Sequence, residues 1–176
     1  MRNILSPILK SRKCDAPSLI ISLVVIIFAI ILISLFFSKF FLALVGEMKS
    51  MEQFQNSTAQ ASFTAVEEKT IPFLDYLIWF SFVSIIIGLI ISSFYIDVHP
   101  AFFIAFIIIL IFVTVLAGVF SNVIQTVGQD SQMASTYSQF RITPIIVNNF
   151  PAMVFVVGLM VAIVLYGKSR GGNVPV

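Results

Sequence analysis

The sequence predicts an all-α, polytopic integral membrane protein, with four transmembrane helices arranged as two antiparallel hairpins and helical polar extensions on the outer side. Of the 176 residues, 59% are hydrophobic and only 10% are charged, too few charges to cover a soluble domain. The apolar segments reach the roughly 20 residues that cross a hydrocarbon core. They do not alternate polar and apolar residues as barrel strands do, so helices must satisfy the backbone in lipid. We expect one domain over residues 1–176, with spans at about 19–45, 73–96, 101–120 and 144–166 and outer segments at 47–69 and 121–141.

The first span follows a basic N-terminal segment. Its apolar run, Leu19–Ser38, is longer than the core of a usual secretory signal, and no small-residue cleavage site follows it. We therefore expect an uncleaved transmembrane helix. Lys39 comes at the end of this run, where its ammonium can reach the headgroups. The alternative is that Lys39 faces a partner's carboxylate inside a complex.

The outer segment Glu47–Lys69 is polar but rich in residues that favour helices. Apolar side chains recur near it at almost helical spacing, at Val45, Met48 and Met51. The first helix is therefore expected to continue beyond the membrane as a short amphipathic stalk. Residues 56–58 read Asn-Ser-Thr, which matches the glycosylation pattern, but a motif this short is more often a chance match.

The second and third spans are the runs Phe73–Ile96 and Ala101–Phe120, joined at residues 97–100. The link is too short to cross a membrane, so these two helices are expected to be antiparallel neighbours. Pro72 is taken as the boundary before the second span. Asp75 lies just inside this span at interfacial depth, and the nearby Tyr76 and Trp79 are typical interface anchors.

Small residues recur every four positions along one face of the second span. Small side chains at that spacing allow helix backbones to approach closely in lipid. The favoured interpretation is packing within the chain, against the third span. The predicted helix-packing residues are Ser81, Ser84, Gly88 and Ser92.

The last third of the sequence contains a second outer segment and the fourth span. The segment Ser121–Arg141 is rich in Gln, Ser and Thr and is interrupted by Gly128. The fourth span, Pro144–Tyr166, contains polar residues at 148 and 149 and a proline at 151. Its first turns are therefore expected to be irregular or interfacial.

The distribution of charge predicts the orientation. With four spans, both termini and residues 97–100 lie on one side of the membrane. That side carries six Lys and Arg against two Asp, whereas the other side carries four Lys and Arg against six acidic residues. An excess of Lys and Arg marks the cytoplasmic side, so both termini are predicted to be cytoplasmic, or on an equivalent inner side.

A shift of 72 residues aligns parts of the two halves without a gap. Gly46 then aligns with Gly118, and Pro72 aligns with Pro144. A true duplication would give two similarly oriented hairpins, an arrangement known in transporters. The alternative is a coincidence in a compositionally biased region, and the sequence leaves both interpretations open.

The sequence offers little catalytic chemistry. The only histidine, His99, lies beside Asp97 in a short polar turn, and the only cysteine is Cys14, which excludes an intrachain disulfide. Catalytic serine motifs and phosphate-binding glycine loops are absent. No ionisable residue lies in the middle of a span, which argues against ion-coupled transport. We therefore expect no enzymatic activity, no cofactor and no metal site, and the net charge of +2 does not indicate nucleic-acid binding.

The resulting hypothesis is a non-enzymatic structural or assembly subunit of a larger membrane-embedded complex, in a cellular membrane or the membrane of a membrane-containing virion. The alternative is a small homo-oligomeric channel or holin-like pore. The expected partners are the lipid bilayer and other membrane protein subunits, including copies of itself. Large apolar side chains in the outer segments would contact a partner, or would only pack on each other and cap the bundle. These candidate contacts are Met48, Met51, Phe54, Phe63, Met133, Tyr137 and Phe140.

Overall fold

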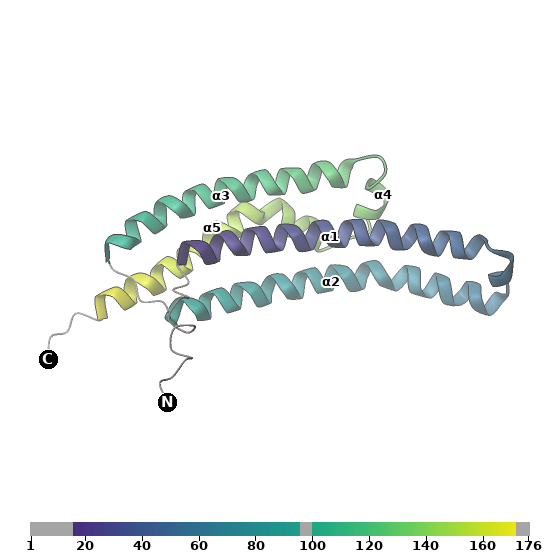
Figure 1. Cartoon of the computed structure of the whole chain (residues 1–176), viewed down its shortest axis with the longest axis horizontal. Helices are drawn as coiled ribbons and strands as arrows, with labels where there is room; N and C mark the ends of the chain where they lie inside the picture. Colours follow the sequence, from purple (N-terminus) through teal and green to yellow (C-terminus); the bar gives the residue numbers. More distant parts are fainter. Residues whose placement is uncertain (1–15, 96–99, 172–176) are drawn as a thin grey trace, which may run out of the picture.

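The computed structural model describes residues 16–95 and 100–171, and this part of the chain consists of helices joined by short turns (Figure 1). Four of the helices are long and apolar enough to cross a membrane. The predicted all-α, polytopic membrane fold is therefore confirmed. The elements are α1 (Ala16–Ser50), the 3-10 helix η1 (Glu52–Phe54), α2 (Ser57–Tyr95), α3 (Pro100–Gln129), α4 (Ala134–Tyr137) and α5 (Thr143–Gly171).

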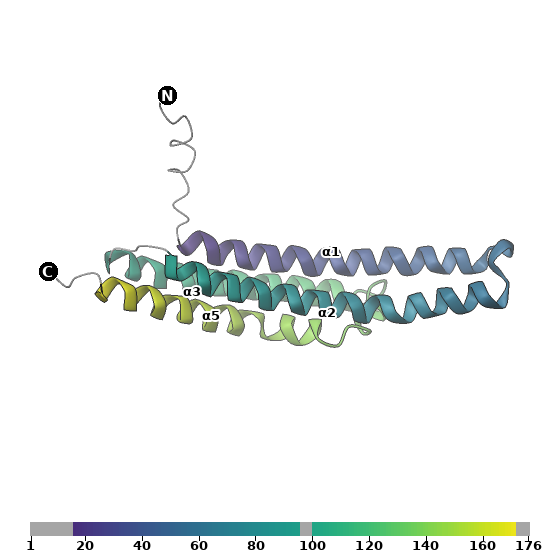
Figure 2. The same ribbon diagram turned by 90° about the horizontal axis from the view of Figure 1, so that it is seen from below.

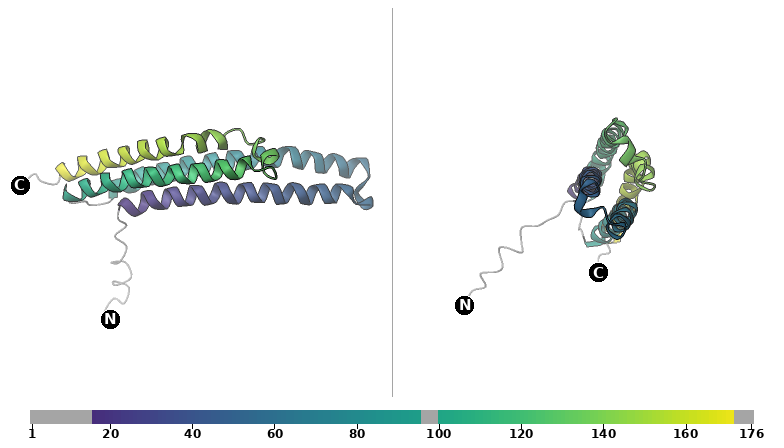
Figure 3. Two further views of the ribbon diagram at one scale, coloured as in Figure 1. Left: turned by 90° about the horizontal axis from the view of Figure 1, so that it is seen from above. Right: turned by 90° about the vertical axis from the view of Figure 1, so that its right-hand side faces the viewer.

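The four long helices form a bundle in which each packs against two neighbours. Helix α1 packs along α2 and α3, and α5 packs along the same two helices (Figure 3). Helices α2 and α3 therefore lie diagonally across the bundle, and the prediction that the second and third spans are direct neighbours is wrong. A connection of four residues can span about 13 Å, similar to the diagonal of a bundle with axes 8–10 Å apart. A short link thus brings two helix ends together without making the helices pack.

The start of α1 and the end of α5 lie at the same end of the bundle (Figure 2). At this end Lys168 Nζ donates a hydrogen bond of 3.0 Å to the carbonyl oxygen of Phe94, which joins the last turns of α5 and α2. We call the opposite end the distal end. The cytoplasmic location of the termini stays a prediction. The basic residues 2–13, Cys14, and the turn with Asp97 and His99 lie outside the described residues.

Helices α1 and α2 extend well beyond α3 and α5 at the distal end (Figure 1). We call this projecting part, residues 46–70, the stalk. Helix α2 begins at Ser57 rather than after Pro72, and it runs through the proline, so the predicted boundary there is wrong. Pro72 removes only one backbone donor, and it does so near the polar end of the bundle. Most of the predicted outer segment 47–69 therefore belongs to α2, not to a continuation of α1.

Helix α5 is continuous from Thr143 through Pro151, so the expectation of irregular first turns is wrong, whereas their interfacial position stays a prediction. Pro151 has no N–H, so the carbonyl of Val147 lacks its usual helical donor. The buried Ser121 hydroxyl from α3 donates to that carbonyl at 2.6 Å. A polar side chain on the neighbouring helix thus compensates for the proline, as helix breaks in lipid require.

Helices α3 and α5 approach each other closely at Gly158. A Cβ atom added at Gly158 would lie 2.1 Å from Cδ1 of Leu110, far inside contact distance. Between α1 and α3, the rings of Phe28 and Phe120 stack with centroids 4.2 Å apart. The centre of the bundle is filled by fully buried apolar side chains, which include Ile31, Leu35, Ile78, Leu110, Val113 and Phe150.

Candidate functional site at the distal end

Asp75 is the only buried carboxylate among the described residues, with 4% of its surface exposed. One carboxylate oxygen, Oδ2, accepts the backbone N–H groups of Arg141 and Ile142, each at 2.8 Å. The other, Oδ1, accepts the N–H and the hydroxyl of Thr143, at 2.8 and 2.6 Å. A side chain of α2 therefore caps α5, where the helix dipole also favours a negative charge.

This cap accounts for the backbone donors at the start of α5. The Thr143 N–H goes to Asp75, and the next residue, Pro144, has no N–H to satisfy. The N–H groups of Ile145 and Ile146 both donate to the carbonyl of Ile142, at 3.0 and 3.1 Å. The sequence placed Asp75 at interfacial depth but gave no sign of its partner, 66 to 68 residues further along the chain.

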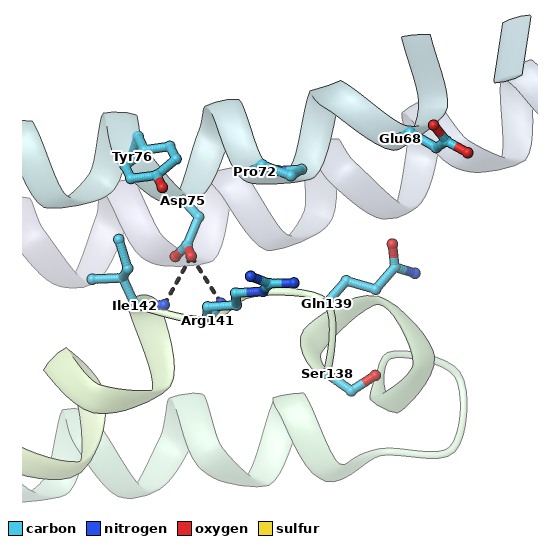
Figure 4. A pocket seen from close by; sticks show the side chains of 8 residues that line it. All are labelled: Glu68, Pro72, Asp75, Tyr76, Ser138, Gln139, Arg141 and Ile142. Atoms are coloured by element: carbon cyan, nitrogen blue, oxygen red, sulfur yellow. Dashed lines mark hydrogen bonds between the residues drawn. The ribbon is translucent and has the colours of Figure 1, made fainter. Parts of the chain in front are cut away.

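A pocket of about 460 Å³ lies beside this cap, between α2 and the segment that precedes α5 (Figure 4). Arg141 and Gln139 reach from that segment toward α2 near Pro72, and Tyr76 lies on the other side of Asp75 (Figure 4). The remaining lining residues are Glu68, Ser138 and Ile142.

A second polar cluster joins α3 to α5 one turn deeper in the bundle. The Gln125 amide donates to the Ser121 hydroxyl at 3.2 Å and to Asn148 Oδ1 at 3.1 Å. Asn149 instead donates to the carbonyl of Ile145 in its own helix, at 2.9 Å. These hydrogen bonds explain why polar residues at 148 and 149 are tolerated in a helix that crosses a membrane.

The segment between α3 and α5 caps the bundle rather than presenting free apolar side chains. Met133 and Phe140 are 7% and 2% exposed and belong to the core. The Tyr137 ring packs so closely on Gly128 that a Cβ there would lie 2.7 Å from it, and burial raises the pKa of its phenol. The prediction that Met133 and Phe140 are partner contacts is therefore wrong for this conformation, and the capping alternative describes them.

The stalk is held by polar contacts between its two helices. Lys49 of α1 forms an ion pair with Glu67 of α2. The Gln60 amide donates to the carbonyls of Lys49 and Phe54, at 3.0 and 3.3 Å. Asn56 Oδ1 accepts the N–H of Ala59 at 2.7 Å and so caps α2. Asn56, the first residue of the Asn-Ser-Thr pattern, thus has a structural role.

The apolar candidate contacts in the stalk differ in their exposure. Phe54 and Phe63 are half-buried and pack edge to face, with centroids 5.6 Å apart. Met48 is half-buried, whereas Met51 is 49% exposed at the tip of the stalk. Met51 is therefore the candidate that a partner can reach without disturbing the hairpin.

The predicted helix-packing face of α2 has open space at its centre rather than a packed neighbour. Ser84 and Gly88 are exposed, and no atom lies within 4 Å of a Cβ built at Gly88. Ser81 and Ser92 are half-buried. The favoured interpretation, packing against the third span, is therefore wrong.

The small residues that do allow close packing lie on α3 and α5. Gly158 and Ala162 are spaced by four on α5, and Ala117 and Ser121 are spaced by four on α3. All four are buried. The rule of small residues spaced by four also finds these pairs. A single sequence gives no reason to prefer them to the pairs on α2.

The described residues contain no group of three His, Cys, Asp or Glu side chains that could hold a metal ion. The chemistry available at the distal end is therefore hydrogen bonding and charge, from Asp75, Arg141, Glu68 and the amides around them. Comparison with protein-family models, with curated proteins and with solved structures finds no match to this chain.

Proposed function

We propose that the chain is a non-enzymatic assembly subunit of a larger membrane complex, and that the stalk is the element that binds its partner. The observation that carries the proposal is the unequal length of the two helix pairs. Helix α2 has 39 residues and α5 has 29. At 1.5 Å per residue α2 is about 58 Å long, far more than the roughly 30 Å that a hydrocarbon core requires.

The stalk has the features of a contact surface rather than of a linker. An ion pair and a hydrogen bond from the Gln60 amide to the Lys49 carbonyl join its two helices, and an aromatic pair joins η1 to α2. A rigid projection loses little conformational entropy when it binds. It also keeps Met51 and Val66 exposed, at 49% and 46%. Large exposed apolar side chains outside the membrane typically mark contacts with another molecule.

The interior of the bundle supports an assembly role over a pore within one chain. The side chains that meet between the helices are large and apolar, among them Leu35, Ile78 and Leu110. The buried polar side chains of the spans, such as Ser121 and Asp75, are engaged in hydrogen bonds. These groups therefore favour a packed core over a hydrated path.

Photo-crosslinking in the native membrane tests the proposal. A photoreactive amino acid at Met51 or Val66 should give a discrete adduct with another protein chain. The matched control is Ile108, which is 64% exposed in the apolar part of α3 and should react with lipid alone. Met51→Glu should weaken the complex on a native gel without changing helicity, whereas Glu52→Gln should have no effect. Changing Phe54 or Tyr137 is less informative, since both pack within the chain.

The competing function is a homo-oligomeric channel, and the purified protein decides between the two. We expect no reproducible conductance from the protein alone in planar bilayers. Defined single-channel currents, together with stalk crosslinks only to copies of this chain, would contradict the assembly role and favour the channel.

A further inference from the structure

The pocket beside Asp75 has the lining of a site for a small zwitterion. Glu68 on α2 supplies a negative charge, and Arg141 on the facing segment supplies a positive charge. Neither Glu68 nor Arg141 forms an ion pair with another described residue, and the two do not form an ion pair with each other. The third charge, on Asp75, is already engaged by three backbone N–H groups and a hydroxyl. The two remaining charges suit a ligand with one cationic and one anionic group.

Neutral groups complete each half of the pocket. Arg141 and Gln139 reach into the gap from the same segment, beside the Ser138 residue that also lines it (Figure 4). The Ser138 hydroxyl already donates to a backbone carbonyl of α4, at 3.1 Å. The Gln139 amide uses one of its two hydrogens on the same carbonyl, also at 3.1 Å, so its second hydrogen and the Arg141 guanidinium can donate to phosphate oxygens. On the other side, Pro72 lacks the N–H that the Glu68 carbonyl would normally accept. The carboxylate and this carbonyl of Glu68 are both acceptors for an ammonium.

The depth of the pocket matches that of lipid headgroups. Pro72 and Tyr76 line the pocket immediately before the apolar part of α2. Helix α5 enters its own apolar run after Thr143. Tyrosine is enriched at this boundary between membrane and water. A volume of about 460 Å³ lies within the usual range of small-molecule pockets.

We propose that this pocket binds the headgroup of a zwitterionic phospholipid with a primary ammonium, of the phosphatidylethanolamine type. Its phosphate lies against Arg141 and Gln139, and its ammonium lies against Glu68. A primary ammonium donates three hydrogen bonds, which the quaternary ammonium of phosphatidylcholine cannot do. The site therefore prefers the former lipid. This inference does not depend on the proposed assembly role.

The protein contains its own reporter for the site. Trp79 is the only tryptophan, and it follows Asp75 by four residues and Tyr76 by three. Residues at these spacings share one face of a helix, so Trp79 lies one turn deeper on the face that lines the pocket. Bromine on the acyl chain of a bound lipid will quench its fluorescence.

The experiment uses the full-length protein in phosphatidylcholine vesicles. Each vesicle preparation contains one brominated lipid, and the fraction of brominated lipid is the same in all preparations. The wild-type protein should associate with brominated phosphatidylethanolamine roughly threefold more than with brominated phosphatidylcholine, the size expected for partly exposed charge pairs. Arg141→Gln and Glu68→Gln should each reduce this preference to about one. Lys69→Gln and Glu52→Gln make the same charge changes on exposed residues outside the pocket, and both should keep the preference.

Three results would overturn the proposal. One is equal quenching by the two lipids in the wild type. Another is a stronger preference for anionic phosphatidylglycerol that Glu68→Gln increases, because the site would then be a simple basic patch. The third is loss of the wild-type preference for phosphatidylethanolamine in the presence of excess soluble phosphoethanolamine, which would assign the pocket to a soluble headgroup compound. Far-UV circular dichroism of each variant verifies the fold, and both altered side chains are exposed.

Discussion

The two pairs of antiparallel helices, α1 with α2 and α3 with α5, are held together by different kinds of contact. Helices α3 and α5 approach closely at Gly158 and share the Ser121 hydrogen bond to a backbone carbonyl. Helices α1 and α2 have open space at Gly46 and Gly88, and their interhelical polar contacts lie in the stalk. The polar contacts of the short pair therefore lie within the apolar part of the bundle, whereas those of the long pair lie in the stalk.

This difference shows why small residues alone do not identify an interface. In lipid there is no hydrophobic force that favours one apolar face over another, so packing depends on close fit and on hydrogen bonds. Gly158 faces a side chain that fills the space beside it, whereas Gly88 faces nothing within 4 Å. The same residue type is therefore closely packed in one pair and has open space beside it in the other.

The comparison also bears on the 72-residue repeat. Pro144 lies in the first turn of α5, but its counterpart Pro72 lies well inside α2. A Cβ atom built at Gly118 lies 3.8 Å from the Pro151 ring, whereas no atom lies within 4 Å of a Cβ built at its counterpart Gly46. The secondary structure therefore does not repeat with this period.

The largest expected effect comes from the contact that joins the two pairs. Asp75→Ala leaves three backbone N–H groups and the Thr143 hydroxyl without their acceptor. We expect a loss of about 3 kcal/mol in the free energy of unfolding, because each unsatisfied buried group costs about 1–3 kcal/mol and water can replace part of this. Unfolding in mixed micelles, followed by circular dichroism, measures it. Glu68→Ala, on the exposed surface nearby, is the control, and equal stability of the two variants would contradict the role of the cap.

Matched glycine substitutions test the contrast between the pairs directly. Gly158→Ala should destabilise the protein by about 1–3 kcal/mol, because Leu110 must move. Gly88→Ala should be neutral or slightly stabilising, because it meets no atom and reduces the entropy of the unfolded chain. The same micelle assay measures both. If Gly88→Leu folds normally but loses a native complex, the outer face of α2 packs against another chain; if both alanine variants are equally stable, the contrast is wrong.

A double-mutant cycle tests the compensation for the proline in α5. Ser121→Ala should cost about 1 kcal/mol, since it removes the donor to the Val147 carbonyl. In a Pro151→Ala background the helix regains its own donor, so the same Ser121→Ala change should cost much less. An identical cost in both backgrounds would show that the serine acts by packing alone.

The smallest effect is expected in the stalk. Lys49→Ala removes an ion pair whose partners are 24% and 43% exposed, so the loss should be no more than about 0.5 kcal/mol. It should also shrink as salt is added. Hydrogen exchange of amides in the stalk, compared with those of α5, is the measurement. Faster exchange in α5 as well would mean that the stalk and the bundle open together, and the division into two regions would be wrong.

Much of the fold follows from local composition. Runs of about 20 apolar residues must be helices that cross the membrane, since no other structure satisfies their backbone there. Prolines predict helix boundaries or irregular turns poorly in this chain, because their effect depends on what replaces the missing hydrogen bond. At Pro151 the replacement is Ser121, 30 residues earlier in the sequence, and no local pattern signals it.

The sequence by itself determined that the chain has four membrane-spanning helices, which turns are polar, and where charge gathers. Only the tertiary structure decided that α2 and α3 lie diagonally, that Asp75 caps α5, and that Met133 and Phe140 are buried. The physical reason is that the spans are apolar on all sides. Hydropathy therefore reports that a helix enters lipid, but the helix's neighbours are selected by side-chain fit and by a few hydrogen bonds between residues far apart in the sequence.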